Sequence, residues 1–457
     1  MSDITANLAY ESHSIAHHGP RLRISEKIAL TAMGIGSMLL ALSLIAVNGS
    51  TSETLKNLWF NISWALAIGG GGYFALSKHL KDRPGVRNQG KTTDSLTARG
   101  AWGWMLGIVF TGFYIIIYWF PQYLEGLTRL HDGLSQFLQG KPADEWFVYG
   151  TVYTILTTLM GAKAIAKYRH NRYHIVRTSV IIFAQLIFAY LFPAICVKFN
   201  QPEVYLTYFW PLAYDKLFPS TVMHLFHSGG LGYFIAGWFI CGTFLATPVL
   251  TYYFGKRWYC SWVCGCGGLA NTMGDSWRQL SDKSLKSWKI ERWSIYSVLA
   301  LIFSLTVLLW CEPYLPASMK EIVYQIRRFY LFGIGAVFSG VIGVGFYPLM
   351  GTRMWCRFGC PMAAFLGLLQ RFNSRFRITT NGAQCISCGN CSKYCEMGID
   401  VRHYAQRGQN IIRASCVGCG ICATVCPRGV LSLENGPTNN RYNHEEGLSL
   451  LGKMKSR

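Results

Sequence analysis

The sequence predicts an all-helical membrane domain of about eight transmembrane helices, followed by a small α+β domain built on two cysteine motifs. Three observations lead to this fold class. Hydrophobic residues make up 51% of the 457 residues and charged residues only 14%, well below the roughly 25% of soluble domains. Long apolar runs alternate with short basic loops as far as Arg371, and from Phe372 onward regularly spaced cysteines replace them.

The membrane domain should contain the runs of about 20 apolar residues, the length that crosses a bilayer as a helix. Eight runs qualify: Ile28–Val47, Leu58–Leu76, Trp102–Phe120, Phe147–Ile165, Ser179–Val197, Leu231–Phe254, Ile295–Pro313 and Leu331–Met350. The first run lacks a small-residue cleavage site and further spans follow it, so it predicts a retained helix rather than a signal peptide. The predicted organisation is a tail (1–27), a transmembrane domain (28–371), a soluble domain (372–434) and a mobile tail (435–457).

The basic residues indicate how these helices are oriented. The net charge is +21, but Lys and Arg gather in short loops between apolar runs, which is typical of a membrane protein and does not indicate a nucleic-acid partner. The N-terminal tail and the loops on its side of the membrane hold 21 Lys and Arg residues, and the loops on the opposite side hold 8. Because loops rich in Lys and Arg stay in the cytoplasm, we expect both termini and the soluble domain there.

A short pattern occurs twice in the membrane domain. The pattern G-x-R-x-(aromatic)-C-x-x-x-C begins at Gly255 and again at Gly351, 96 residues later, each time just after a predicted span. Five matching positions at equivalent places are hard to attribute to chance. The pattern therefore predicts an internal repeat of a helix hairpin, each copy ending in a cysteine turn.

The soluble domain contains the spacing C-x-x-C-x-x-C-x-x-x-C twice. A cubane [4Fe–4S] cluster needs four thiolates; the tight turn of one motif supplies three and the other motif supplies the fourth. The spacing predicts a two-cluster ferredoxin domain. Its ligands are Cys385, Cys388, Cys391 and Cys426 for cluster A, and Cys395, Cys416, Cys419 and Cys422 for cluster B.

Two alternatives fit this spacing poorly. Zinc sites usually separate their cysteine pairs by a dozen or more residues, and disulfides do not suit a reducing cytoplasm. One departure from the motif is Glu396, which follows Cys395 where the second motif has a proline after Cys426. We expect it to alter the exit turn but not to remove the ligand.

The combination of many spans, two C-x-x-x-C turns and a C-terminal pair of cluster motifs resembles a bacterial family of membrane polyferredoxins. That family includes the quinol dehydrogenase subunit of periplasmic nitrate reductase, the nitrous oxide reductase regulator and the cytochrome oxidase accessory protein. The resemblance covers Leu231–Glu434. The family turn reads C-x-x-x-C-P, which the turn ending at Pro361 matches, whereas the first turn has Gly265 in place of proline and adds Cys266.

The resemblance implies a location in the bacterial inner membrane and a place in a multisubunit membrane complex with redox partner proteins. The chain has neither the flavin-bearing domain of the nitrous oxide regulator nor the immunoglobulin-like domain of the oxidase accessory protein. The quinol dehydrogenase type is therefore the nearer analogue, and quinone is the membrane substrate that it implies.

The cysteines of the two turns are candidates for a further centre at the membrane edge. Because cysteines four apart share a helix face, Cys260, Cys264, Cys356 and Cys360, with Cys266 as a fifth candidate, could meet across the two copies. Four thiolates suit an iron–sulfur cluster or a soft metal such as Cu(I), and a thiol pair could cycle with a disulfide. Simple burial at a packed turn is the alternative.

Histidines are weaker candidates. His224 and His227 lie at the outer end of the sixth predicted span and could contact haem or quinone, although an interfacial pair without a ligand is the simpler interpretation. His170 and His174 belong to a basic loop and are expected to be solvated.

The predicted function is electron transfer between a quinone pool or membrane-edge redox centre and a redox partner, through two [4Fe–4S] clusters. No catalytic residue is identified, and the chain is expected to be a redox subunit of an oxidoreductase complex. Two alternatives remain open: a reductase or assembly factor for copper or another metal, and a membrane anchor that connects a soluble dehydrogenase to the membrane.

Overall fold

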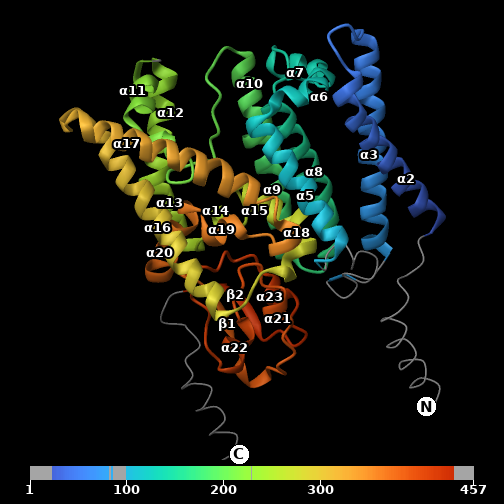
Figure 1. Cartoon of the computed structure of the whole chain (residues 1–457). Helices are drawn as coiled ribbons and strands as arrows, with labels where there is room; N and C mark the ends of the chain where they lie inside the picture. Colours follow the sequence, from blue (N-terminus) through green and yellow to red (C-terminus); the bar gives the residue numbers. More distant parts are fainter. Residues whose placement is uncertain (1–22, 82–83, 86–98, 228, 437–457) are drawn as a thin grey trace, which may run out of the picture.

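The computed structural model describes residues 23–81, 84–85, 99–227 and 229–436. Over these residues the chain is mostly helical, and a small domain with a two-stranded sheet lies at one end of the long helices (Figure 1). Most of the two predicted tails, residues 1–22 and 437–457, lie outside the described residues.

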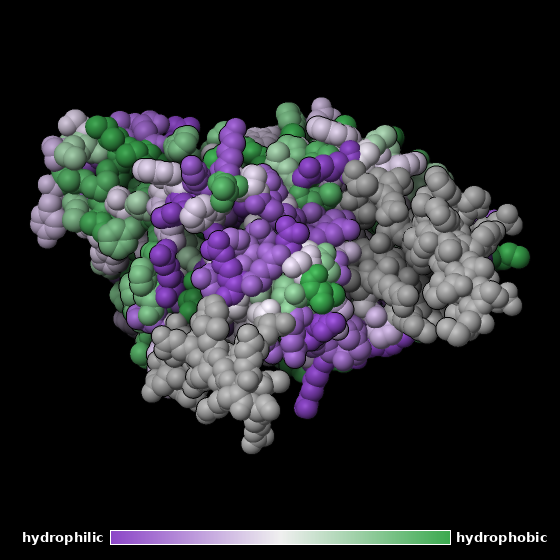
Figure 2. Space-filling model, turned by 90° about the horizontal axis from the view of Figure 1, so that it is seen from below, coloured by the Kyte–Doolittle hydropathy of each residue, from purple (hydrophilic) through white to green (hydrophobic). Residues whose placement is uncertain are grey.

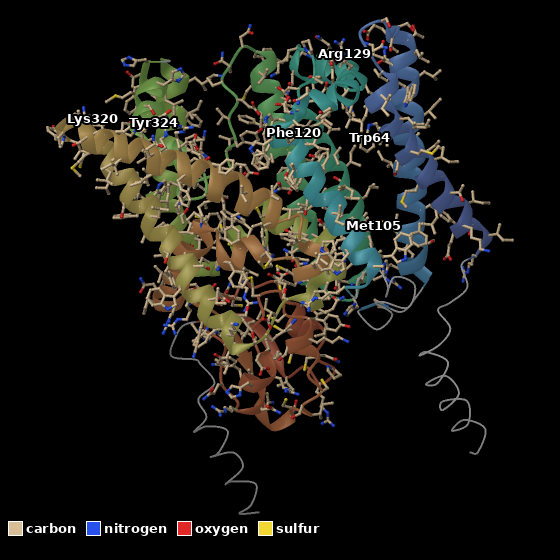
Figure 3. The ribbon with its side chains drawn as sticks, viewed as in Figure 1. Trp64, Met105, Phe120, Arg129, Lys320 and Tyr324 are labelled. Carbon is tan, nitrogen blue, oxygen red and sulfur yellow. The ribbon has the colours of Figure 1, made fainter. Side chains whose placement is uncertain are left out.

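Five helices in the described part of the chain are long and apolar enough to cross a membrane. They are Ile24–Ala46 (α2), Ala101–Trp119 (α5), Arg172–Lys198 (α9, η2 and α10), Gly230–Phe254 (α12, η4 and α13) and Leu285–Trp310 (α16). Each overlaps one of the eight predicted runs. Their surfaces expose large apolar side chains, such as Met105 on α5 (Figure 3), as expected of helices that face lipid.

The other three predicted runs are helical but do not meet the same criteria of length and apolarity. They lie in α3 (Glu53–Lys81), in α8 (Glu145–Lys167), and in η7 with α18 (Tyr330–Ile342 and Tyr347–Met350). α8 is less apolar because threonines lie on its buried face, and the last run is divided between two helical segments. The total of eight spans stays a prediction.

Short elements connect and subdivide these helices. Two of the spans are each made of three consecutive helical segments. The span Arg172–Lys198 consists of α9 (Arg172–Phe183), η2 (Ala184–Leu191) and α10 (Phe192–Lys198). The span Gly230–Phe254 consists of α12 (Gly230–Cys241), η4 (Gly242–Ala246) and α13 (Thr247–Phe254). The shorter elements are η1 (Pro121–Leu124), α6 (Glu125–Leu130), α7 (Asp132–Gln139), η3 (Tyr214–Leu217), α11 (Pro219–His227), α14 (Arg257–Cys260), α15 (Gly265–Asn271), η5 (Met273–Leu280), η6 (Glu312–Tyr314), α17 (Ala317–Phe329), α19 (Met354–Phe358) and α20 (Pro361–Asn373).

The C-terminal domain follows α20. Its strands β1 (Phe376–Thr380) and β2 (Leu431–Asn435) pair antiparallel and close the domain by joining its two ends. The short elements between them are η8 (Gly382–Gln384), α21 (Asn390–Lys393), α22 (Val401–Gln406) and α23 (Ile421–Thr424). Hydrophilic side chains are prominent near the centre of the face seen from this end of the molecule (Figure 2).

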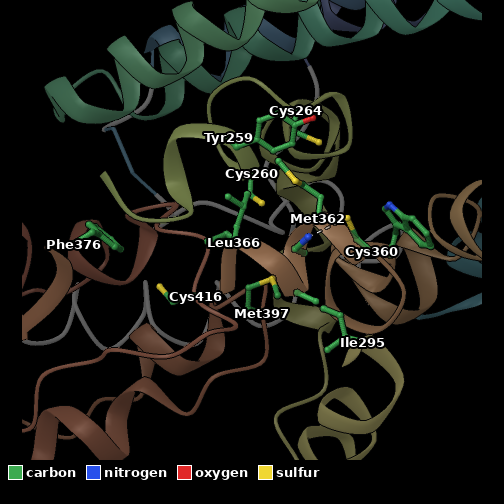
Figure 4. Close-up of a cluster of buried hydrophobic side chains, with 14 of the residues drawn as sticks. Tyr259, Cys260, Cys264, Ile295, Cys360, Met362, Leu366, Phe376, Met397 and Cys416 are labelled. Carbon is green, nitrogen blue, oxygen red and sulfur yellow. Dashed lines mark hydrogen bonds between the residues drawn. The ribbon is translucent and has the colours of Figure 1, made fainter. Parts of the chain in front are cut away.

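One hydrophobic core joins the two parts of the chain. It extends from Tyr259 and Met362 beside the cysteine turns to Phe376 and Met397 in the C-terminal domain (Figure 4). Independent domains would each bury a core of their own. The shared core therefore holds the C-terminal domain in one position against the cysteine turns.

Candidate iron–sulfur centres

The C-terminal domain brings its eight motif cysteines together in two groups of four. Cys385, Cys388, Cys391 and Cys426 line one small cavity, and Cys395, Cys416, Cys419 and Cys422 line another. These are the groups that the spacing predicts, because the last cysteine of each motif lies with the first three of the other. Four thiols around one cavity are the donor set that a cubane cluster requires.

Both motifs shape the cavity with the same local turn. Gly389 and Gly420 each follow the second cysteine of a motif, adopt left-handed φ angles of 78° and 83°, and precede the one-turn helices α21 and α23. Glycine takes this conformation without the steric cost of a Cβ atom. Burial raises the pKa of Cys416 to about 11, so its thiol becomes a thiolate only when metal binding displaces the proton.

The two membrane-edge turns have the same backbone structure. The N–H of Cys264 donates to the carbonyl of Tyr259, and the N–H of Cys360 donates to the carbonyl of Trp355, both at 2.9 Å. Cys264 and Cys360 are also the N-caps of α15 and α20. The repeated pattern thus corresponds to a repeated turn, while a relation between the flanking helix hairpins stays a prediction.

The turns place four of the candidate cysteines close to one another. Cys260, Cys264, Cys356 and Cys360 are each 5–6% exposed and interact electrostatically across the two turns; Figure 4 shows three of them. Among the described residues no group of three or more His, Cys, Asp or Glu side chains is arranged around a single metal ion.

Cys266 distinguishes the first turn from the second. Hydrogen bonds from the Cys266 thiol, and from backbone N–H groups at the start of α15, hold the pKa of Cys264 below its usual value. Burial instead raises the pKa of Cys260 to about 12. Because the thiolate is the nucleophile and the metal ligand, Cys264 is the cysteine of this turn best prepared to act as either.

The cluster B motif lies directly against the membrane domain. The hydroxyl of Ser261, in the first turn, donates to the carbonyl of Val417 at 2.7 Å, and the amide of Gln370 on α20 donates to the carbonyl of Cys416 at 2.8 Å. Cys416 is buried, whereas Cys388 of cluster A is exposed. The cluster B site is thus next to the membrane-edge cysteines, and the cluster A site is the more open to solvent.

The histidine predictions have mixed outcomes. His174 is fully buried and its Nε2 lies 2.7 Å from the hydroxyl of Thr424 in the C-terminal domain, so the expectation of a solvated side chain is wrong; docking of that domain covers it. His224 and His227 lie on α11, a helix separate from the span that begins at Gly230. α11 is at the end of the helices away from the C-terminal domain (Figure 1).

The sequence interpretation missed a group of buried charges between the two kinds of cysteine site. Glu396 is fully buried and forms ion pairs with Arg278 at 2.6 Å and Arg353 at 2.9 Å. Its carbonyl also accepts a hydrogen bond from Ser281 at 2.7 Å. Two signals were available: Glu396 replaces a proline at a motif exit, and Arg353 is the arginine of the repeated turn pattern.

Comparison with known proteins supports this assignment. Residues 384–431 match the model of the 4Fe-4S dicluster domain family. YccM of Escherichia coli K12, named as a candidate electron transport protein, is 27% identical over 158 residues, which are 32% of this chain and 43% of YccM. No solved structure is significantly similar to the chain.

Two further relatives are methylamine utilization ferredoxin-type proteins named MauN. The protein of Paracoccus denitrificans is 31% identical over 171 residues, which are 35% of this chain and 56% of MauN. That of Methylorubrum extorquens is 26% identical over 147 residues, which are 31% of this chain and 48% of MauN. The matches thus span about half of each relative. The predicted relationship is confirmed: the chain is a homologue of ferredoxin-type electron transport proteins and fits the membrane polyferredoxin family.

Proposed function

We propose that this chain carries electrons between the quinone pool of a bacterial inner membrane and a soluble redox partner, with the C-terminal domain on the cytoplasmic face. The electrons would pass through a redox centre held by the membrane-edge cysteines, and then through cluster B and cluster A in series. The observation that carries this proposal is the docking of the cluster B motif on the first cysteine turn, where Ser261 holds Val417. An order of sites that runs from the membrane edge to the solvent is what a relay requires.

A cavity beside the second turn supports quinone as the membrane substrate. The cavity has a volume of about 1050 Å³. It lies between apolar side chains of η7 and α18, such as Phe338 and Leu349, and the basic side chains of Arg99 and Arg353. Pockets for small organic ligands are typically lined by apolar groups with a few placed polar ones. Apolar walls suit the quinone ring and tail, and the exposed guanidinium group of Arg99 can donate to a quinone oxygen.

The protein's own contribution is to hold the clusters, since iron and sulfide supply the redox chemistry. Cys385, Cys388, Cys391 and Cys426 would hold cluster A, and Cys395, Cys416, Cys419 and Cys422 would hold cluster B. Cluster A, with the exposed Cys388, would face the partner protein. YccM is named for electron transport and the MauN proteins are named as ferredoxin-type proteins, and we extend only these two properties to the chain.

Metal analysis tests the proposal. Protein purified without oxygen should contain about eight iron and eight sulfide per chain, because each cubane holds four of each. A reduced quinone analogue added to that protein should generate the EPR signals of reduced clusters. A preparation with one cluster, or with zinc in place of iron, would contradict the proposal. Iron well above eight per chain would instead indicate a further centre at the membrane-edge cysteines.

A further inference from the structure

Buried charges connect the cluster B site to the membrane-edge cysteines. Glu396, the residue after the cluster B ligand Cys395, accepts a hydrogen bond from Nη1 of Arg278 at 2.6 Å and from Nε of Arg353 at 3.0 Å. All three charged side chains are at most 1% exposed. Burying charges in this way is costly unless each has a partner, and here the carboxylate is shared by both guanidinium groups.

Each of these arginines also lies against a cysteine sulfur. Nη1 of Arg278 is 3.7 Å from Sγ of Cys419, a cluster B ligand. Nη1 of Arg353 is 3.6 Å from Sγ of Cys356 and donates to the carbonyl of Cys260 at 3.0 Å. A continuous chain of polar contacts therefore runs from a cluster ligand to a membrane-edge thiol, and Glu396 is its centre.

A third arginine adds positive charge on the cluster B side. Arg177, on α9, is fully buried and donates through Nη1 to the carbonyl of Cys419. Its Nε and Nη2 atoms are buried and have no hydrogen-bond partner among the described residues. Two arginines thus face Cys419, while among the described residues the carboxylates that pair with Arg278 are those of Glu396 and Asp275, the latter at 3.1 Å.

We propose that Glu396 positions Arg278 and Arg353 as a charge bridge that raises the reduction potential of cluster B above that of cluster A and couples cluster B to the membrane-edge thiols. The inference rests on the proposed function, because it assumes that both clusters are present. Reduction adds one electron to the cluster and neither forms nor breaks a bond. Hydrogen bonds to the cysteine sulfurs and nearby positive charge stabilise the more negative, reduced cluster.

Cluster A lacks an equivalent setting. Arg402 and Arg428 line its cavity, but both are exposed, and water and salt screen exposed charges. The buried arginines beside cluster B are screened less than the exposed ones beside cluster A, and so they would stabilise a reduced cluster more strongly.

A potentiometric EPR titration of the full-length protein tests the proposal. In Arg278→Gln the midpoint potential of cluster B should fall. At a fixed ambient potential, the ratio of reduced to oxidised cluster B should decrease about tenfold. For a one-electron couple this corresponds to a fall of about 59 mV in the midpoint potential. The potential of cluster A should not change. The matched control is Arg402→Gln, which removes an exposed arginine beside cluster A and should leave cluster B unchanged.

Two further variants separate a charge bridge from a purely structural role. Arg278→Lys keeps the charge but loses the planar fork that reaches both Glu396 and Asp275. It should therefore lower the potential of cluster B by less, and it also serves if Arg278→Gln does not fold. Arg353→Gln should lower the potential of cluster B although Arg353 touches Cys356 and no cluster ligand, because it leaves the charge of Glu396 less compensated.

Three results would overturn the inference: an unchanged cluster B potential in both Arg278 variants, equal shifts of both clusters, or an unaffected cluster B in Arg353→Gln. Iron analysis of the unmodified protein keeps this failure separate from failure of the proposed function. With both clusters present and no shift, only the bridge is wrong. With a cluster missing, the proposed function is wrong.

Discussion

Cys360 and Cys264 occupy equivalent positions in the two turns but differ in their surroundings. Cys264 is followed by Gly265 and accepts hydrogen bonds that lower its pKa, whereas Cys360 is followed by Pro361 and burial raises its pKa. Sγ of Cys360 accepts a hydrogen bond from the backbone N–H of Ala363 at 3.4 Å, an ordinary distance for a sulfur acceptor. Because the turn at Cys360 keeps the proline of the C-x-x-x-C-P pattern and the turn at Cys264 does not, replacing Cys360 is the more informative test.

Replacing Cys360 with serine should abolish reduction of the clusters by a quinol analogue and leave their EPR signals after chemical reduction intact. The variant removes one of four membrane-edge thiols but none of the eight ligands in the C-terminal domain. Serine is close in size to cysteine, so packing should change little. Cys311→Ser, an exposed cysteine after α16, is the control. Normal quinol reduction in Cys360→Ser would leave these cysteines a packing role only.

At the level of elements, a left-handed glycine begins each cysteine turn. Gly255 has a φ of 66° and Gly351 a φ of 88°. A Cβ on Gly255 would lie 2.7 Å from Cβ of Phe376 in β1 and from Oε1 of Gln370 on α20. The first turn therefore approaches the C-terminal domain so closely that it leaves no room for a side chain.

Gly255→Ala should destabilise the protein by about 1–3 kcal/mol, the usual cost of a non-glycine residue in a strained backbone region, and loosen the docking of the C-terminal domain. Thermal unfolding in detergent should show a lower Tm, and limited proteolysis should release the C-terminal domain faster. The control is Gly237→Ala on α12, where a Cβ meets nothing within 4 Å. Equal melting temperatures for the two variants would show that the turn has room to adjust.

Across the whole molecule, the loop before α16 and the C-terminal domain belong to the same end of the structure. Lys283 in that loop lines a cavity together with Gly398 and His403 of the C-terminal domain. The loop is also among the most basic in the chain. Charge bias and tertiary contact thus agree that the two lie on one side of the membrane.

Reporter fusions test this orientation. A fusion after Lys283 should report the cytoplasm, and a fusion after Gly133, on α7, should report the opposite side, because Lys and Arg are retained on the cytoplasmic side. Gly133 and Lys283 are separated by an odd number of predicted spans. A cytoplasmic signal at Gly133 would require a different set of membrane helices.

The sequence by itself was sufficient to predict the helical membrane part, the small C-terminal domain and the grouping of its cysteines. Five of the apolar runs form helices able to cross a membrane, because apolarity over that length leaves few other structures. Cysteines three residues apart can share one cavity through local turns alone, and Cys426 joins the group of Cys385 because β1 and β2 close the domain.

The tertiary structure alone decided which surfaces meet. The ion pair between Arg278 and Glu396 joins residues 118 positions apart, and His174 becomes buried only because Thr424 covers it. Neither contact leaves a periodic pattern in the sequence, since each joins two segments that are far apart along the chain. Polar residues that look like solvated loop charges in the sequence therefore become the buried connection between cluster B and the membrane edge.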